Sequence, residues 1–399
     1  MSKKIEKSVV NSSRPYVEDY LKNQRSNITL VDLFAGIGGF HYGIGAAAKT
    51  LGMGVETLLV SEIEDSCRNV YEINHGNPST IQGDINEIPL RKFAKDEADI
   101  LTAGFPCQPF SNSGRKLGLS DPRGQFYDRI EEIIKAFKSR AFILENVPGI
   151  TKNGGKNFQS ELAVKKNQHV GLTMHMLEQA MKKGLQSSRQ KKSNYNIKWL
   201  EINSSEFGSP QVRKRVYIIG VRADLGEVPD LSEISIDYPL SVFMNIQEES
   251  ADTSLKLSRT QEQNIRSFMK KGMTPSYKEG MRRVGQAYLC AGGNVGQAYH
   301  AYGMVPTLTK VWARFLPIYF PAKGERLPNT DSAEFSPGAD YGKGTIRRAS
   351  VREVMRLQGF PDEFQHHDRD NVAYQHAGNA VNALVIRELS NLLLPIILQ

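Results

Sequence analysis

Short apolar runs recur through the first half of the chain, and most are separated by stretches with helical spacing or polar loop sequence. The runs are rich in β-branched residues and are continuous rather than alternating, which is typical of strands covered on both faces. Strands are predicted over residues 28–34, 56–62, 79–81, 99–103, 141–144, 197–202 and 216–221. This alternation predicts an α/β fold with a doubly wound, mostly parallel sheet, whose ligands bind at the carboxyl ends of the strands.

The sequence changes in character after residue 223. Residues 224–367 contain scattered glycines and prolines and few periodic stretches, which predicts a second, smaller domain. Apolar α/β sequence returns near the C-terminus, so residues 27–223 and 368–399 are expected to form the first domain, after an extension at 1–26. A basic, helix-prone stretch at 157–194 either contacts a polyanionic partner or is a solvated elaboration.

Composition narrows the class of protein. The chain has 399 residues and a formal net charge of +8, which favours a polyanionic partner such as nucleic acid. Part of this charge lies in two basic runs, at 182–192 and 347–356, each of which is alternatively a solvated face. Three cysteines without paired spacing argue against a disulfide framework, and neither they nor the histidines form a metal-binding pattern. Without an apolar membrane span or signal peptide, a cytoplasmic protein with no membrane contact is expected.

A proline-rich loop carries the first candidate for chemistry. The segment LTAGFPCQPFSNSG, residues 101–114, leaves a predicted strand and places Cys107 between Pro106 and Pro109. The prolines fix two φ angles and remove two backbone donors, so the thiol is held on a rigid turn. On this local sequence alone, a reactive nucleophile and a small buried apolar side chain are equally favoured.

The ends of the first three strands indicate a nucleotide site. The first strand runs into FAGIGGF, and its glycines allow a ligand to approach the backbone closely. A dinucleotide fingerprint is not complete, because His41 stands where its last glycine would be, so nicotinamide and flavin cofactors are disfavoured. Glu62 and Asp84 follow the next two strands, and together with Phe34 they suit an adenosine moiety. Either carboxylate is alternatively a helix cap or a surface group.

Two further strands end in charged side chains. Glu145 closes the strand beyond the Cys107 loop and can face the same crevice, where burial would favour the protonated carboxyl and allow it to donate a proton. Arg213 and Arg215 enter the last strand and, in an extended chain, point to the same side. Such a pair suits phosphates or a polarised carbonyl group.

Taken in order, six sequence motifs resemble those of the DNA (cytosine-5)-methyltransferase family of the bacterial restriction-modification type. They are FAGIGG at 34–39, GFPCQ at 104–108, ENV at 145–147, QVRKR at 211–215, RE at 352–353 with RLQGFP at 356–361, and GNAV at 378–381. The resemblance implies a class I S-adenosylmethionine-dependent methyltransferase fold, with residues 224–367 as a target-recognition domain. This sequence departs from the family at His376, where glutamine is usual.

The same resemblance implies S-adenosyl-L-methionine as cofactor. Phe34 would lie against the adenine, Glu62 would bind the ribose, and Asp84 would bind the adenine amino group. The remaining residues implied for this pocket are Gly36, Gly38, Gly39, Ile63, Ile85, Pro106, Asn379, Ala380 and Val381.

For the reaction, the resemblance implies a covalent mechanism on a cytosine flipped out of double-stranded DNA. Cys107 would attack carbon 6 of the base, Glu145 would protonate ring nitrogen 3, and Arg215 would hold the ring carbonyl oxygen.

The residues implied to contact DNA are less specific. Arg213 and Ser111 would contact flanking phosphates. The dipeptide Thr307–Leu308 resembles a marker of the recognition region, and Asn294 and Gln297 are candidates to fill the gap left by the base or to read its neighbours. These last two are equally well explained as turn residues.

Three competing functions remain open. An RNA methyltransferase of the same fold would carry a Cys-Phe-Thr tripeptide, whereas Cys290 is followed by Ala291. An inactive DNA-binding relative is disfavoured by the joint presence of Cys107, Glu145 and Arg215. An unrelated cysteine hydrolase would need a histidine base near its nucleophile. The main hypothesis is a monomeric DNA methyltransferase that protects DNA from a cognate restriction endonuclease.

Overall fold

The computed structural model describes residues 26–76, 78–93, 96–106, 126–148, 194–230, 253–270, 283–288, 295–300, 305–311, 313–320, 322 and 344–399. The chain forms two compact units. The first unit comprises Met1–Asn203, Lys214–Ile234 and Ala383–Gln399, and the second comprises Ser204–Arg213 and Ser235–Asn382. The second unit therefore takes in a ten-residue segment from inside the predicted first domain, and it continues past residue 368 to Asn382. The chain passes from the second unit to the first directly after Arg213 and again directly after Asn382.

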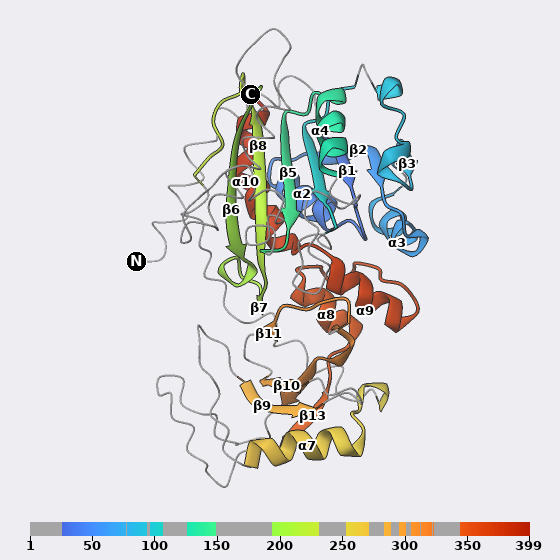
Figure 1. Ribbon diagram of the computed structural model, residues 1–399, viewed down its shortest axis with the longest axis vertical. Coiled ribbons are helices and arrows are strands. Elements are labelled where there is room, and N and C mark those ends of the chain that lie inside the picture. Colours follow the sequence, from blue (N-terminus) through green and yellow to red (C-terminus); the bar gives the residue numbers. More distant parts are fainter. Residues whose placement is uncertain are drawn as a thin grey trace, which may run out of the picture. The chain divides into compact units, whose positions relative to one another are not determined.

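The first unit is built on a seven-stranded sheet with the order β3-β2-β1-β4-β5-β8-β6 (Figure 1). The strands are β1 Asn27–Leu33, β2 Gly54–Ser61, β3 Ile81–Gln82, β4 Ile100–Gly104, β5 Ala141–Asn146, β6 Tyr195–Asn203 and β8 Lys214–Arg222. Strands β1 to β5 pair in parallel, and β8 runs antiparallel to both β5 and β6. The predicted α/β fold with its mostly parallel sheet is confirmed.

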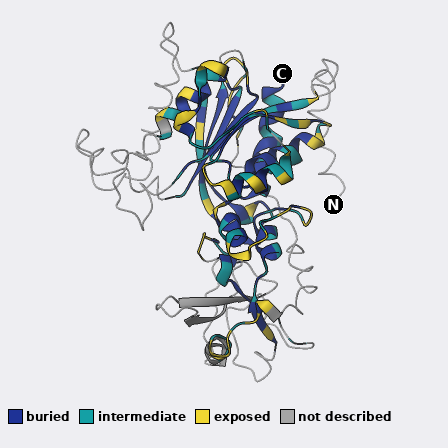
Figure 2. Cartoon of the chain, turned by 90° about the vertical axis from the view of Figure 1, so that its right-hand side faces the viewer, coloured by how far each residue is buried: buried dark blue, intermediate teal, exposed yellow. Residues whose placement is uncertain are grey.

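Continuous apolar runs form these strands because both faces of the sheet are covered. All six residues of β5 are buried, and the strands of the large sheet are coloured mostly as buried in Figure 2. Helix α4, Phe126–Ala136, contributes Ile130, Ile133 and Ile134 to a core shared with β1, β4 and β5. Burial of such side chains contributes about 1.5–3 kcal/mol each, which is the main stabilising term for the sheet.

Two further helices, α2 at Gly39–Thr50 and α10 at Ala383–Ile397, pack against each other. The approach is close: a Cβ atom at Gly43 would lie 2.6 Å from Cβ of Ile386. The stretch Asp370–Ile397 is long and apolar enough to cross a membrane, but 56% of its apolar window is buried within the protein. Helix α3, Asp65–His75, follows β2.

The second unit contains a small sheet of order β13-β12-β10-β9 and a two-stranded pair. Its strands are β7 Gln211–Val212, β9 Arg283–Tyr288, β10 Val295–His300, β11 Val305–Pro306, β12 Pro317–Phe320 and β13 Thr345–Arg348. Its helices are α7 Arg259–Lys270, α8 Val351–Leu357 and α9 Asp370–Asn379. Helix α8 begins with a capping box, in which Ser350 and Glu353 satisfy each other's backbone N–H groups.

The basic run at 347–356 lies around β13 and α8, and its arginines have partners within the second unit. Arg347 makes a buried two-point ion pair with Glu353, at 2.8 and 2.6 Å. Arg356 pairs with Asp362, and Arg352 donates to the carbonyl of Phe364 at 2.7 Å. This run therefore serves to hold its own unit together.

Candidate active site

The loop after β1 has a backbone that favours glycine. Gly36 and Gly38 have φ angles of +55° and +88°, in the left-handed region that side chains rarely adopt. Gly38 is the N-cap of α2, and a Cβ atom there would overlap the imidazole of His75. Phe34 also has a positive φ, of +52°, and its ring meets the edge of Phe126 at 5.3 Å. The positive φ angles, and the close approach of His75 to Gly38, explain why glycine stands at these two positions.

Glu62 joins this loop to the end of β2. Its carboxylate accepts hydrogen bonds from the backbone N–H groups of Gly36, at 2.8 Å, and Glu64, at 2.9 Å. Ile63 follows directly, and its side chain is 71% exposed. Glu62 and Ile63 therefore place a hydrogen-bond acceptor next to an exposed apolar side chain.

Asp84 caps the short 3-10 helix Ile85–Glu87, accepting from the backbone N–H of Asn86 at 2.8 Å. The capping alternative considered for this carboxylate is therefore present in the structure. Ile85 is 3% exposed and packs in the core, and its carbonyl accepts from Arg129. Both residues lie just beyond β3, at the same edge of the sheet as Glu62.

Asp32, near the end of β1, was not among the predicted site residues. It is fully buried, and the hydroxyl of Thr102 donates to its Oδ1 at 2.7 Å. Its Oδ2 has no hydrogen-bond partner among the described residues. Burial raises the pKa of Asp32 to about 7; the Thr102 hydrogen bond opposes this rise, and the charge of Glu62 adds to it. The signal in the sequence that could have identified Asp32 is a carboxylate inside an otherwise apolar strand.

Two stacked histidines, the buried His41 and the half-buried His75, lie beside Gly38 of the glycine loop. The rings of His41 and His75 stack at 4.1 Å, and Nδ1 of His41 lies 2.9 Å from the hydroxyl of Tyr71. Burial lowers the pKa of His41 to about 4. The pKa of His75 falls to about 3, through burial and the neighbouring His41. His41, noted in the sequence only as a departure from a fingerprint, thus belongs to a neutral aromatic cluster.

The carboxyl end of β5 carries the second group of predicted residues. Glu145 is 9% exposed, and its Oε1 lies 3.0 Å from Nε of Arg215. Asn146 donates from its side chain to the carbonyl of Phe105 at 3.2 Å, which ties β5 to the start of the proline-rich loop after β4. Pro106 is the last described residue of that loop. Cys107 and Ser111 lie outside the described residues.

The other predicted residues lie in the second unit. Arg213 is 3% exposed, and its terminal nitrogens donate to the carbonyls of Leu308, Gly378 and Ala380. Asn379 ends α9, with Ala380 and Val381 directly after it, both nearly buried. Gln297 lies in β10, and Asn294 lies outside the described residues.

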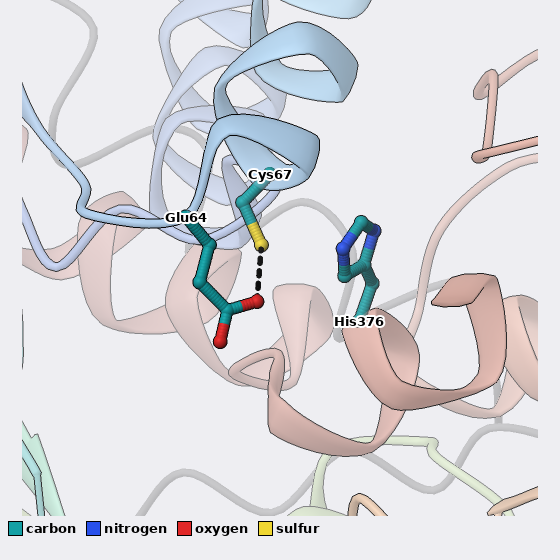
Figure 3. Close-up of side chains that lie close together, drawn as sticks. All are labelled: Glu64, Cys67 and His376. Atoms are coloured by element: carbon teal, nitrogen blue, oxygen red, sulfur yellow. Dashed lines mark hydrogen bonds between the residues drawn. The ribbon is translucent and has the colours of Figure 1, made fainter. Parts of the chain in front are cut away.

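Cys67 lies in the first turn of α3, where its thiol points to the carboxylate of Glu64 (Figure 3). The Sγ–Oε2 distance is 3.9 Å, and the cysteine is buried. This contact is local, three residues apart along the chain, and it leaves Cys67 as a small buried side chain of the kind that free cysteines usually are.

The first unit therefore gathers strand-end residues at one edge of its sheet. Because β1 to β5 are parallel, Phe34, Glu62, Asp84, Pro106 and Glu145 all follow carboxyl ends of strands. Strand order reverses between β1 and β4, which is where open α/β sheets bind ligands. This sheet, with its antiparallel β8 and a glycine loop after β1, defines a class I methyltransferase fold.

Comparison with known proteins gives the family. The profile of the C-5 cytosine-specific DNA methylase family matches residues 28–394, so the chain belongs to that family. It is accordingly a DNA (cytosine-5)-methyltransferase, as its sequence motifs predict.

Relatives from restriction-modification systems are similar over nearly their whole length. The Type II methyltransferase M.NgoBI of Neisseria gonorrhoeae is 30% identical over 375 residues, which cover 92% of this chain and 93% of the relative. M.BanI of Aneurinibacillus aneurinilyticus is 26% identical over 443 residues, covering 91% and 94%. Among solved structures, the Entamoeba histolytica methyltransferase EhMeth shares the fold at a TM-score of 0.59 and 17% identity, covering 92% of this chain and 98% of that one.

Proposed function

We propose that this enzyme transfers a methyl group from S-adenosylmethionine to carbon 5 of a cytosine flipped out of duplex DNA, and so protects a specific site from a restriction endonuclease. The Glu145–Arg215 pair carries the proposal. It places a buried carboxyl group and a guanidinium 3.0 Å apart, at the end of the strand next to the one that leads into the Cys107 loop. A proton donor beside a fixed cation suits protonation of a ring nitrogen next to a carbonyl group.

The residues of the first unit fit the cofactor. Glu62 already accepts two backbone hydrogen bonds, and its carboxylate oxygens have further lone pairs for the ribose hydroxyls. The exposed side chain of Ile63 and the ring of Phe34 would each provide an apolar surface for the adenine. Asp84 would accept from the adenine amino group, and the backbone of Gly36, Gly38 and Gly39 would allow the close approach. When bound, the cofactor supplies an electrophilic methyl group.

In the reaction, the Cys107 thiolate would add to carbon 6 of the cytosine while Glu145 donates a proton to ring nitrogen 3. This addition makes carbon 5 nucleophilic, so that carbon 5 takes the methyl group. A base then removes the proton from carbon 5, the electron pair of that bond expels the thiolate, and ring nitrogen 3 returns its proton to Glu145, which restores the neutral ring. Arg215, oriented by Glu145, would donate to the carbonyl oxygen of the ring throughout. Because stacked neighbouring bases cover the ring faces at carbons 5 and 6, and ring nitrogen 3 is engaged in the base pair, the cytosine must leave the duplex.

The contacts with DNA outside the target base are proposed on the family resemblance. Ser111 would hold a flanking phosphate, and Asn294 and Gln297 would enter the duplex or read neighbouring bases. For Arg213, the structure supports a different role, because its guanidinium is buried and engaged with three carbonyl oxygens.

The experiment that tests the proposal is expression in a host without cytosine methylation, followed by genome-wide mapping of 5-methylcytosine. Modification of one sequence motif by the wild type, and none by a Cys107→Ser variant that still binds DNA, is the expected result. The same cells provide the RNA, in which 5-methylcytosine without DNA modification would overturn the proposal in favour of an RNA methyltransferase. Resistance of the modified DNA to an endonuclease that cuts the mapped site tests the protective role.

A further inference from the structure

Both backbone hydrogen-bonding groups of Leu308 are held by side chains from the short segment around β7. Oε1 of Gln211 accepts from the N–H of Leu308 at 3.1 Å, and Nη1 of Arg213 donates to its carbonyl at 2.8 Å. The hydroxyl of Thr307 also donates to the carbonyl of Val212 at 2.8 Å. Three hydrogen bonds therefore join the Thr307–Leu308 segment to residues 211–213, in addition to the pairing of β7 with β11.

The terminal nitrogens of the same two side chains also donate hydrogen bonds to other segments of the second unit. Arg213 donates from Nη2 to the carbonyl of Ala380 at 2.8 Å, and from both terminal nitrogens to the carbonyl of Gly378 at 3.4 Å. These carbonyls lie on either side of Asn379. Gln211 donates from Nε2 to the carbonyl of Leu357 at 3.2 Å. One arginine thus spans the Leu308 backbone and the backbone of the GNAV motif.

A separate observation brings the same two segments together. A Cβ atom at Gly378 would lie 2.5 Å from both the carbonyl carbon and the carbonyl oxygen of Thr309. The backbones of Gly378 and Thr309 are therefore in direct contact, and only glycine fits between them. Displacement of either segment would press on the other.

Gln211, Arg213 and the carbonyls that they hold form a buried cluster. Burial increases the free-energy cost of breaking any of its hydrogen bonds. Gln211 is fully buried and Arg213 is 3% exposed. A buried guanidinium is tolerated only where its donors are met, and an unmet charged donor costs more than a neutral one. Arginine suits the position because its planar fork reaches several carbonyls at fixed angles, whereas lysine is a point charge.

We propose that Gln211 and Arg213 are positioning residues that couple the target-recognition segment Thr307–Leu308 to the cofactor-lining segment Gly378–Ala380. This inference rests on the proposed function, which assigns those roles to the two segments. A ligand that orders one segment then stabilises the other through the shared side chains. Coupling of this kind is reciprocal, so DNA binding and cofactor binding strengthen each other by the same factor.

The test is calorimetric titration of S-adenosylhomocysteine into the full-length enzyme, with and without a duplex carrying the mapped site. In Arg213→Lys, the affinity without DNA should fall about tenfold, the effect of losing one hydrogen bond to a buried charged donor. The factor by which the duplex tightens binding should fall toward one. Arg352→Lys is the matched control, because Arg352 also donates to backbone carbonyls of the second unit, those of Pro361 and Phe364, and is not part of the cluster. Arg352→Lys should keep the wild-type affinity for S-adenosylhomocysteine and the wild-type effect of the duplex on that affinity.

Thr307→Val supplies a second variant that removes only a partly buried hydroxyl contact at the recognition end. It should weaken S-adenosylhomocysteine binding, although Thr307 makes no contact with the GNAV motif in the described hydrogen bonds. If Thr307→Val, and any folded Arg213→Lys, keep wild-type affinity and the wild-type effect of the duplex, the coupling is wrong, whatever their melting temperatures. Failure of the proposed function is distinguishable, because it would appear in the wild type as an absence of methyl transfer to DNA.

Discussion

The carboxylate of Glu62 accepts the backbone N–H of Gly36 at 2.8 Å, so a side chain at the end of β2 fixes the glycine loop that follows β1. Glu62 also accepts from the N–H of Glu64. One carboxylate thereby orients two loops before any ligand is bound. Pre-organisation of this kind lowers the cost of ordering the loop on binding.

Glu62→Gln is therefore expected to weaken binding of S-adenosylhomocysteine by about tenfold or more, because an amide can present only one oxygen to the two backbone donors. Isothermal titration calorimetry checks the affinity. Glu64→Gln is the control, since this exposed neighbour loses the same charge while the backbone N–H that it donates to Glu62 is kept. Equal losses in the two variants would contradict the role given to Glu62.

Glu145→Gln should slow methyl transfer far more than it weakens DNA binding. Loss of a general acid typically costs about 10²–10⁴-fold in rate. Single-turnover methylation and an equilibrium DNA-binding assay give the two quantities. Glu131→Gln provides a matched change, because Glu131 is also a buried carboxylate of the first unit and lies on α4. Equal losses of rate and DNA affinity in Glu145→Gln would point to a structural role instead.

Gly38→Ala should destabilise the first unit through two separable effects. The left-handed backbone costs a non-glycine residue about 1–2 kcal/mol, and the new methyl group overlaps the imidazole of His75. Chemical unfolding of Gly38→Ala, His75→Ala and the double variant measures both effects. Because His75→Ala removes the overlap, the glycine substitution should cost less in that background. Strictly additive losses would show that the His75 ring does not restrict the loop.

Asp32→Asn should become more stable relative to the wild type as the pH rises from 4 to 7. The unfolded aspartate ionises near its ordinary pKa of 3.8, whereas the folded pKa is about 7. The folded state therefore binds the additional proton in this range, and wild-type stability falls with pH by up to about 1.4 kcal/mol per unit from this group.

Denaturant unfolding of both proteins at several pH values tests this prediction. His41 and His75 act in the opposite direction, because their folded pKa values lie below the ordinary 6.5 and stability is lost as the pH falls below it. Their contribution cancels when the variant is compared with the wild type at each pH. A difference that does not change between pH 4 and 7 would contradict the raised pKa of Asp32.

Much of the architecture follows from local pattern. Continuous apolar runs predicted each strand of the large sheet, with boundaries that differ by a few residues, because a strand buried on both faces has no polar face to interrupt the run. Helix α8 likewise has a local start in the sequence, because Ser350 and Glu353 are spaced to form its capping box. Glu62, Asp84 and Glu145 could be selected because parallel strands bring their carboxyl ends to one edge.

Other features depended on contacts between residues that are far apart in the sequence, which no local pattern predicts. Arg213 was expected to share a side with Arg215, yet Arg215 pairs with Glu145 while Arg213 holds carbonyls 95 to 167 residues away. The hydrogen bonds of Gln211 and Arg213 with Leu308, and the contact of Gly378 with Thr309, also join segments that are far apart in the sequence. The basic run at 347–356 was a candidate for a polyanion, but its arginines are engaged with carboxylates and carbonyls of their own unit.

The sequence by itself determined the class of fold, the order of the chemical motifs and the family, because periodicity, strand ends and motif spacing are local properties of the chain. Only the tertiary structure decided which carboxylates and guanidinium groups meet. A backbone carbonyl looks the same at every position in a sequence, so the choice of Leu308, Gly378 and Ala380 as acceptors for Arg213 is made by the folding of distant segments against one another.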